Sequence, residues 1–460
     1  MMAIGTSWIS DWNPEDQKFW ESKGKFIARR NLIWSIFAEH LGFSIWLIWS
    51  IVATKLPQAG FHYTTDQLFQ LVALPGLIGS LMRFPYTFAV VTFGGRNWTI
   101  FSASVLFIPV LALSYFVTKP DTPFWLMLLV AATAGLGGGN FASSMTNISF
   151  FYPDRMKGWA LGLNAAGGNI GVSSVQLLTP ILLGVGFINL YLGVPSSGGS
   201  YLQNAGLMWL LPLTIALCGA IFFMNNLATA RSTLRDQLAI VGRKHTWIMS
   251  YIYIGTFGSF IGYSAAFPLL IKTQFPEVTI GIAFLGPLVG SLSRPLGGLL
   301  ADKVGGAIVT FWNFIAMGAA TLGVMSFIEA KEFAGFLTMF LIVFITTGVG
   351  NGSTYRMIPS IFREEKLREA TAGEMAKSLA LKAASIESGA ALGFIGAIGA
   401  CGGYLIPRGF GASIAATGGP YLALEIYLTF YATCLVLTWW YYLRKAPLTS
   451  GAPSLAQARV

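Results

Sequence analysis

The chain has 460 residues, of which 54% are hydrophobic and only 10% are charged. Soluble proteins carry about 25% charged residues, so this composition excludes an ordinary soluble protein. The 29 Lys and Arg residues outnumber the 19 Asp and Glu residues and give a formal net charge of +10. Apolar stretches that are long enough to cross a bilayer as helices recur along the chain, about twelve in all. The sequence therefore predicts an all-α integral membrane protein.

In chain order, the sequence begins with a polar stretch that has no apolar core and so lacks the pattern of a cleavable signal peptide. Two long apolar regions follow, and a polar segment separates them. We expect a cytoplasmic N-terminal segment (1–31), a first six-helix half (32–224), a cytoplasmic linker (225–246), a second six-helix half (247–443) that contains a charged cytoplasmic loop (363–387), and a cytoplasmic tail (444–460).

The positive charge follows a topological pattern. Most Lys and Arg residues lie in the N-terminal segment, the linker, the tail and alternate loops. Membrane proteins keep Lys and Arg in cytoplasmic segments, so this pattern predicts that both termini are cytoplasmic. It also explains the charge without a nucleic-acid partner. Three arginines, Arg83, Arg294 and Arg356, lie inside apolar stretches and are not explained by topology.

The two apolar regions repeat each other. The segment GSLMR at 79–83 recurs as GSLSR at 290–294, and a Gly-Gly pair follows each arginine at the same distance. The same offset carries GNFASSMTNISFF (139–151) onto GNGSTYRMIPSIF (350–362) and aligns Asn140 with Asn351. Repeated halves are typical of secondary transporters, in which the substrate binds near the midplane of the membrane. Arg83 and Arg294 are thus equivalent positions, which a pseudo-symmetric fold could bring to one central site.

Two buried guanidinium groups require negative charge. A charge inside a membrane is costly and normally has a partner or lines a cavity. One interpretation is that each arginine pairs with a buried carboxylate, but the apolar stretches hold few acids, chiefly Glu39 and Glu425. The other is that a small oxyanion supplies the charge, because the planar fork of arginine donates parallel hydrogen bonds to such ions. We favour an anion as the substrate.

Other motifs point away from catalysis. GLGGGN (135–140) follows no strand and lies within an apolar stretch, so it does not indicate a nucleotide-binding loop. The three histidines are scattered and lack metal-ligand spacing, and the three cysteines lie in apolar stretches where we expect no disulfide. We therefore expect no enzyme, no cofactor and no metal.

Several segments resemble known transporters. GGLLADKVGG (297–306) resembles the signature loop of the major facilitator superfamily. Within that superfamily, LMRFPYTFAVVTFGGRNWT, TFGSFIGYSAAF and the long glycine-rich segment that begins GGGNFASSMTNISFF resemble the nitrate/nitrite porter family. The resemblance runs from about residue 11 to residue 445 and implies the major facilitator fold, with two six-helix halves.

The resemblance also implies a substrate and the residues that bind it. Nitrate or nitrite would be held by two arginines (Arg83 and Arg294), enclosed by two phenylalanines (Phe141 and Phe257), and hydrogen-bonded by Tyr253 and Asn169. It further implies a monomer in the bacterial cytoplasmic membrane. This substrate agrees with the anion that the paired arginines favour.

Two features depart from the best-known exchangers of the family. Glu39 and His40 lie inside the first apolar stretch, and Arg356 lies where those exchangers tend to have a neutral polar residue. Glu39 could relay protons, with His40, or form a structural ion pair, for example with Arg356. Arg356 could attract anions from the cytoplasm or form an ion pair.

These features slightly favour nitrate/proton symport by alternating access. Nitrate/nitrite antiport, which exchanges equal charges and needs no titratable residue, stays open. An anion channel is a more remote alternative.

Overall fold

The structure is a computed structural model that describes residues 8–185, 200–229, 239–370 and 374–444, together with Leu455 and Val460. The chain divides into two compact units, each described here by itself. Unit 1 comprises residues 1–231 and 264–287, and unit 2 comprises residues 232–263 and 288–460. Residues 264–287 therefore pack with the first unit, although they follow the polar linker in the sequence.

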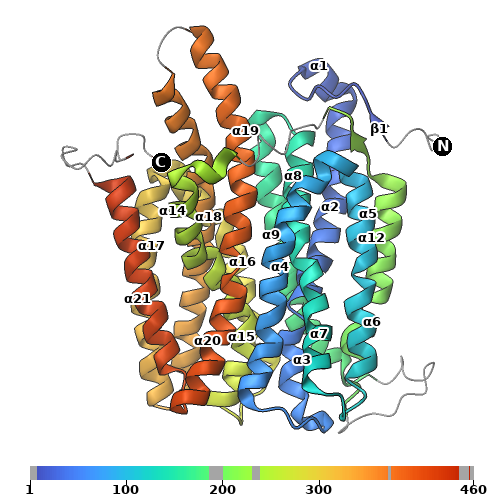
Figure 1. The fold of residues 1–460 in the computed structure, drawn as a ribbon, viewed down its shortest axis with the longest axis vertical. Coiled ribbons are helices and arrows are strands. Elements are labelled where there is room, and N and C mark those ends of the chain that lie inside the picture. Colours follow the sequence, from blue (N-terminus) through green and yellow to red (C-terminus); the bar gives the residue numbers. More distant parts are fainter. Residues whose placement is uncertain (1–7, 186–199, 230–238, 371–373, 445–454, 456–459) are drawn as a thin grey trace. The chain divides into compact units, whose positions relative to one another are not determined.

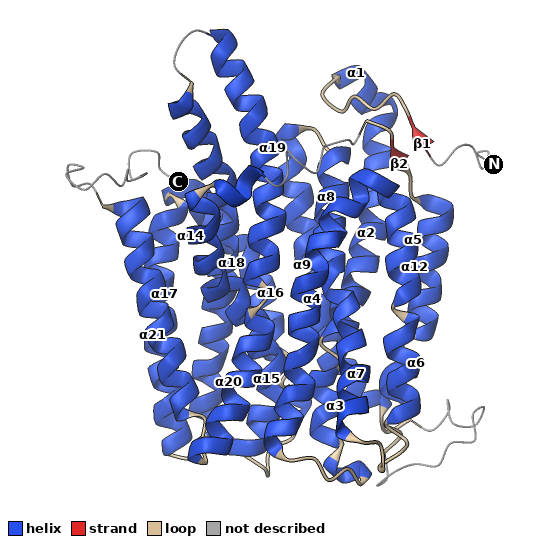
Figure 2. Cartoon of the chain, in the orientation of Figure 1, coloured by secondary structure: helices blue, strands red, loops and turns tan. Residues whose placement is uncertain are grey.

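Unit 1 is built almost wholly of helices (Figures 1 and 2). Its helices are α1 (Gln17–Phe19), α2 (Lys25–Trp46), α3 (Trp49–Lys55), α4 (Thr65–Phe93), α5 (Gly95–Val105), α6 (Phe107–Phe116), α7 (Phe124–Ala134), α8 (Asn140–Phe151), α9 (Asp154–Leu182), α11 (Asn204–Leu207) and α12 (Leu210–Phe223), with the π-helix η1 (Trp20–Gly24) and the 3-10 turns η2 (Pro57–Ala59), η3 (Gly135–Gly139) and η6 (Ile280–Ile282).

All secondary-structure elements in the described part of unit 2 are helices, joined by short loops (Figure 2). Its elements are η4 (Ala239–Gly242), α14 (Lys244–Tyr253), the π-helix η5 (Ile254–Gly258), the first part of α15 (Ser259–Gln274), most of α16 (Leu285–Val304), α17 (Gly306–Glu329), α18 (Phe333–Glu369), α19 (Glu374–Gly399), α20 (Gly402–Thr417), α21 (Tyr421–Thr438) and the π-helix η7 (Trp439–Leu443).

Eleven helical segments of the described chain are long and apolar enough to cross a membrane, judged by length and composition. The prediction was about twelve. Helix α9 is not among the eleven, although its 29 residues are long enough to span. Its buried Asn164, Asn169 and Gln176 lower its mean hydropathy. Helix α9 is therefore less apolar than the eleven segments.

The Gly-Gly pairs of the repeat end equivalent helices. Helix α4 ends at Phe93, before Gly94, and α16 ends at Val304, before Gly305. The two glycines have φ angles of +89° and +100°, a backbone conformation that residues with a Cβ rarely adopt. Each begins the turn into the next helix, so the repeat preserves the turn together with the arginine.

The N-terminal segment of unit 1 packs against the ends of other helices. Strand β1 (Trp8–Ile9) pairs in parallel with β2 (Asn226–Leu227) (Figure 2). The Trp12 indole donates to the Phe150 carbonyl at 3.1 Å, and Trp20 contacts Tyr152 edge-on. Burial raises the pKa of Tyr152 to about 12, against a smaller lowering by Arg29. The start of the predicted linker is therefore held by the N-terminal segment.

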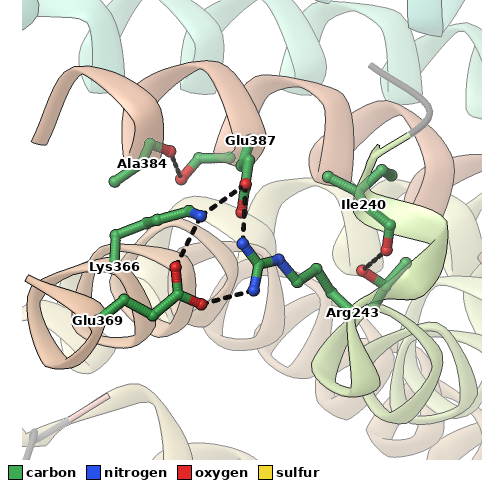
Figure 3. A network of polar contacts seen from close by, with 8 residues as sticks. Ile240, Arg243, Lys366, Glu369, Ala384 and Glu387 are labelled. Carbon is green, nitrogen blue, oxygen red and sulfur yellow. Dashed lines mark hydrogen bonds and ion pairs between the residues drawn. The ribbon is translucent and has the colours of Figure 1, made fainter. Parts of the chain in front are cut away.

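The other end of the predicted linker belongs to unit 2. Arg243 donates to Glu369 at 2.6 Å and to Glu387 at 3.0 Å (Figure 3). The Lys366 Nζ lies 2.9 Å from a carboxylate oxygen of Glu369 and 2.9 Å from one of Glu387. Burial lowers the pKa of Arg243, but the hydrogen bonds to Glu387 and Glu369 outweigh it and raise the pKa above its ordinary value. This network joins the residue before α14 to the last turn of α18 and to the middle of α19.

Candidate anion-binding site

Arg83 is fully buried in unit 1. It lies on α4, with none of its side chain accessible to solvent. Its Nε donates to the Gly138 carbonyl at 3.1 Å. Its guanidinium carbon lies 4.7 Å from the centre of the Phe141 ring and 5.3 Å from the centre of the Trp46 ring. A buried cation is thus held by aromatic faces, which attract positive charge electrostatically.

Glycines allow the elements around Arg83 to approach closely. All residues of turn η3 (Gly135–Gly139) except Leu136 are glycines, and the turn leads directly into α8. A Cβ at Gly138 would lie 2.6 Å from the Cα of Gly79 on α4, closer than real Cβ atoms come. The glycines of GLGGGN therefore allow the Gly138 carbonyl and Phe141 to lie against Arg83.

Asn169 has unsatisfied hydrogen-bonding groups. It lies on α9 and is 1% exposed. Within the described part of the chain, neither its Nδ2 nor its Oδ1 has a hydrogen-bond partner. Leaving a buried amide unpaired costs free energy, so a buried side chain of this kind suits a polar ligand. The sequence-based prediction of a hydrogen-bonding role for Asn169 fits this environment.

Arg294 is the corresponding arginine of unit 2. It lies on α16 and is 6% exposed. Its guanidinium carbon lies 5.3 Å from the centre of the Tyr355 ring on α18. The ring centres of Tyr355 and Tyr253 are in turn 6.1 Å apart. The second arginine therefore also lies against an aromatic face, although on a tyrosine that the sequence did not single out.

Tyr253 and Phe257 form a stacked pair in unit 2. Tyr253 ends α14 and Phe257 lies in η5, and both are fully buried. Their ring centres are 5.3 Å apart with an angle of 18° between the planes. The Tyr253 hydroxyl donates to the Asn351 side chain at 2.7 Å. The π-helical turn between them and this hydrogen bond set the direction in which the tyrosine hydroxyl points.

Glu39 is a buried carboxylate in unit 1. It is fully buried on α2 and accepts hydrogen bonds from Ser144 on α8 and Asn164 on α9. A Cβ at Gly168 would overlap its Oε1, so the glycine makes room for the carboxyl group. The neighbouring His40 is half-buried, and its Nδ1 lies 3.1 Å from the Gly167 carbonyl. Both groups are therefore held against α9.

Arg356 is partly exposed and forms an ion pair. Its guanidinium contacts Asp302, the aspartate of GGLLADKVGG, and about half of each side chain is exposed. Its partner is Asp302, on α16 of the same unit. The attraction of anions by Arg356, the other interpretation of the sequence, stays a prediction.

The structure brings together some of the predicted residues within each unit. In unit 1, Arg83 contacts Phe141, and in unit 2, Tyr253 stacks on Phe257. Trp46 and Tyr355, which contact the two arginines, are not among the residues that the sequence predicted. A signal existed for Tyr355, which lies one residue before Arg356 in the repeated segment. A signal for Trp46 was the glycine of GSLMR, Gly79, against which the indole packs.

Comparison with known proteins agrees with this architecture. The profile of the Major Facilitator Superfamily matches residues 32–373. The solved structure of a D-xylose-proton symporter aligns with a TM-score of 0.65 over 92% of this chain and 98% of its own, at 15% identity. A bacterial homologue of the human lysosomal transporter Spinster aligns with a TM-score of 0.61 over 89% of this chain and 95% of its own, at 14% identity. The fold is that of a secondary transporter of this superfamily.

Sequence relatives narrow the class. The nitrate/nitrite transporter NarU of Salmonella typhimurium is 45% identical over 450 residues, which cover 95% of this chain and 97% of the relative. The probable nitrate/nitrite antiporter NarK2 of Thermus thermophilus is 38% identical over 461 residues, which cover 96% and 98%. The chain therefore belongs to the nitrate/nitrite porter family of the major facilitator superfamily, as the sequence motifs predicted.

Proposed function

We propose that the protein transports nitrate and nitrite across the bacterial cytoplasmic membrane by alternating access, as a monomer with both termini in the cytoplasm. The observation that carries the proposal is the fully buried Arg83, held on the faces of Trp46 and Phe141. Nitrate and nitrite are flat, weakly hydrated anions. An apolar, aromatic environment with a few fixed donors therefore suits them better than it suits strongly hydrated ions.

Six residues carry the binding in this proposal. Arg83 and Arg294 supply the positive charge and parallel hydrogen-bond donors that an oxyanion accepts. Phe141 and Phe257 present ring surfaces to the flat ion. The remaining donors are the Asn169 amide and the Tyr253 hydroxyl, which would turn from Asn351 to the anion; both side chains are fully buried or nearly so.

We further propose that uptake is coupled to protons through Glu39, with His40 as a second titratable group. An inside-negative membrane potential opposes the entry of a lone anion by about 2.3 kcal/mol per 100 mV. Cotransport with protons removes this barrier. Glu39 is fully buried and accepts hydrogen bonds from the neutral side chains of Ser144 and Asn164. A buried carboxyl group of this kind can gain and lose a proton during transport.

The test is nitrate uptake into proteoliposomes that contain no nitrite, with an acid-outside pH gradient switched on or off. We expect uptake only with the gradient, together with acidification of the interior. Glu39→Gln is expected to lose at least about 10-fold of the gradient-driven uptake. Glu425→Gln, which changes an exposed glutamate of α21, is the matched control and is expected to behave like wild type.

Other outcomes identify the competing mechanisms. Uptake that stays absent until nitrite is loaded inside, and that is unaffected in Glu39→Gln, would identify an antiporter and reject the proton proposal. Counterflow of labelled nitrate separates transporter from channel. A transporter accumulates label transiently when unlabelled nitrate is loaded inside and the voltage is clamped at zero, whereas a channel does not.

A further inference from the structure

The indole of Trp46 lies beside the charged group of Arg83, and the geometry points to Trp46 as a residue that positions this guanidinium for the anion. This inference rests on the proposed function, because it assigns Trp46 a part in binding the transported ion. Trp46 is the last residue of α2 and is 1% exposed. Trp46 is not one of the six residues that the sequence predicted to bind the anion.

A hydrogen bond and two aromatic contacts help to hold the guanidinium. Nε donates to Gly138, and the aromatic rings of Phe141 and Trp46 lie 4.7 and 5.3 Å from the guanidinium carbon. A hydrogen bond at Nε sets the plane of the group and thereby the direction of its two terminal amino groups. The aromatic faces attract the delocalised cation without supplying a competing negative charge. A carboxylate in their place would neutralise the arginine and compete with an anionic substrate.

Trp46 is itself held to the helix that carries Arg83. Its Nε1 donates to the Pro75 carbonyl at 2.7 Å, and Pro75 lies on α4. The edge of the indole packs against Gly79, also on α4, where a Cβ would overlap Nε1. A Cβ at Gly138 would lie 2.8 Å from the indole Cε2. The indole therefore has one position, defined by the helix and the turn that also bind Arg83.

Phe43 completes the aromatic surroundings of this position. It contacts Trp46 edge-on, with ring centres 5.5 Å apart, and Phe141 edge-on at 6.1 Å. The two rings that contact the guanidinium are thus packed against a common third ring from α2. Such packing restricts the movement of side chains that must hold a binding group in a defined geometry.

Substitution of Trp46 separates its two contributions. Trp46→Phe keeps an aromatic face but loses the Nε1 donor to Pro75, and Trp46→Leu loses both. We expect Trp46→Leu to raise the KM for nitrate about 3- to 30-fold, the range of a cation–aromatic contact, with a smaller change in the maximal rate. Trp46→Phe is expected to lie between Trp46→Leu and wild type.

Trp49→Phe is the matched control, because Trp49 is equally buried, at 1%, and lies on α3. Its KM should equal that of wild type. Melting temperature and amount in the membrane are measured for each variant, so that a folding defect is distinguished from a change in binding. If Trp46→Leu does not accumulate, the conservative Trp46→Phe decides the question.

The outcomes separate this inference from the proposed function. A wild-type KM in the Trp46 variants, with transport lost in Arg83→Lys, would overturn the role of Trp46 and leave the function intact. A changed melting temperature with an unchanged KM would likewise reduce Trp46 to packing. Wild-type transport by Arg83→Lys would instead overturn the proposed role of Arg83 itself.

Discussion

Arg83 and Arg294 occupy equivalent positions in the repeat, but their surroundings differ. Arg83 contacts the rings of Trp46 and Phe141 and a carbonyl of η3, whereas Arg294 lies against the ring of Tyr355. Phe141, which contacts Arg83, is equivalent to Gly352 in unit 2. A Cβ at Gly352 would lie 2.8 Å from the backbone nitrogen of Gly298, so the glycine there serves the close approach of α18 to α16.

A second pair of equivalent positions shows the same divergence. The offset that aligns Asn140 with Asn351 also aligns Ser144 with Tyr355. Ser144 donates to Glu39, whereas Tyr355 lies beside Arg294. Both halves of the repeat therefore keep the arginine and the helix that carries it. The equivalent positions nearby differ, because Ser144 contacts a carboxylate in unit 1 and Tyr355 contacts an arginine in unit 2.

The largest effect is expected from replacing each arginine by lysine. Arg83→Lys and Arg294→Lys keep the charge but lose the planar fork, and we expect nitrate uptake to fall roughly 100-fold in both. Uptake by proteoliposomes measures the effect. If Arg294→Lys alone kept wild-type uptake, the two positions would differ in role as well as in surroundings, and Arg294 would leave the proposed binding set.

An intermediate effect is expected at Tyr253. Tyr253→Phe removes the hydroxyl that donates to Asn351 but keeps the ring that stacks on Phe257. We expect the KM for nitrate to rise about 10-fold, because the hydroxyl would turn from Asn351 to the bound anion and a hydrogen bond to a charged group contributes about 1.5–3 kcal/mol. Tyr251→Phe is the control, since Tyr251 lies on the same helix and bonds to Thr433. Equal KM values for Tyr253→Phe and wild type would contradict this role.

The smallest effect is expected at Arg356, which follows Tyr355 directly. Its ion pair with Asp302 is about half exposed, and exposed pairs contribute less than about 1 kcal/mol to stability. We expect Arg356→Gln to leave the KM for nitrate unchanged and to lower the melting temperature by only a few degrees. A large rise in KM would show that the exposed arginine takes part in binding, and that burial does not separate the functional arginines from the structural ones.

The fold was predictable because its signals are long and repeated. Apolar stretches indicate spanning helices one by one, and the recurrence of GSLMR as GSLSR relates two halves without any structure. The helix that composition misses, α9, carries buried amides. Buried amides lower the mean hydropathy of a helix that contributes polar side chains to a site. Helix α9, which the hydropathy does not identify, therefore carries a candidate site residue, Asn169.

For the proposed binding residues, the sequence indicates the type of side chain more than the arrangement. A buried arginine indicates an anion because charge inside a membrane is costly, and the family resemblance supplied its neighbours. The contact of Trp46 with Arg83 depends on two glycines from different elements, Gly79 and Gly138, that leave room for the indole. Spacing along one sequence does not reveal which side chain fills such a space.

The two anchored ends of the polar linker have a consequence for the covalent chain. Leu227 is tied into unit 1 through β1, and Arg243 is tied into unit 2 through Glu369 and Glu387. A break between these anchors would leave each fragment with its own anchoring contacts. The gene could therefore be divided at this point and the transporter produced as two polypeptides, with a different label on each.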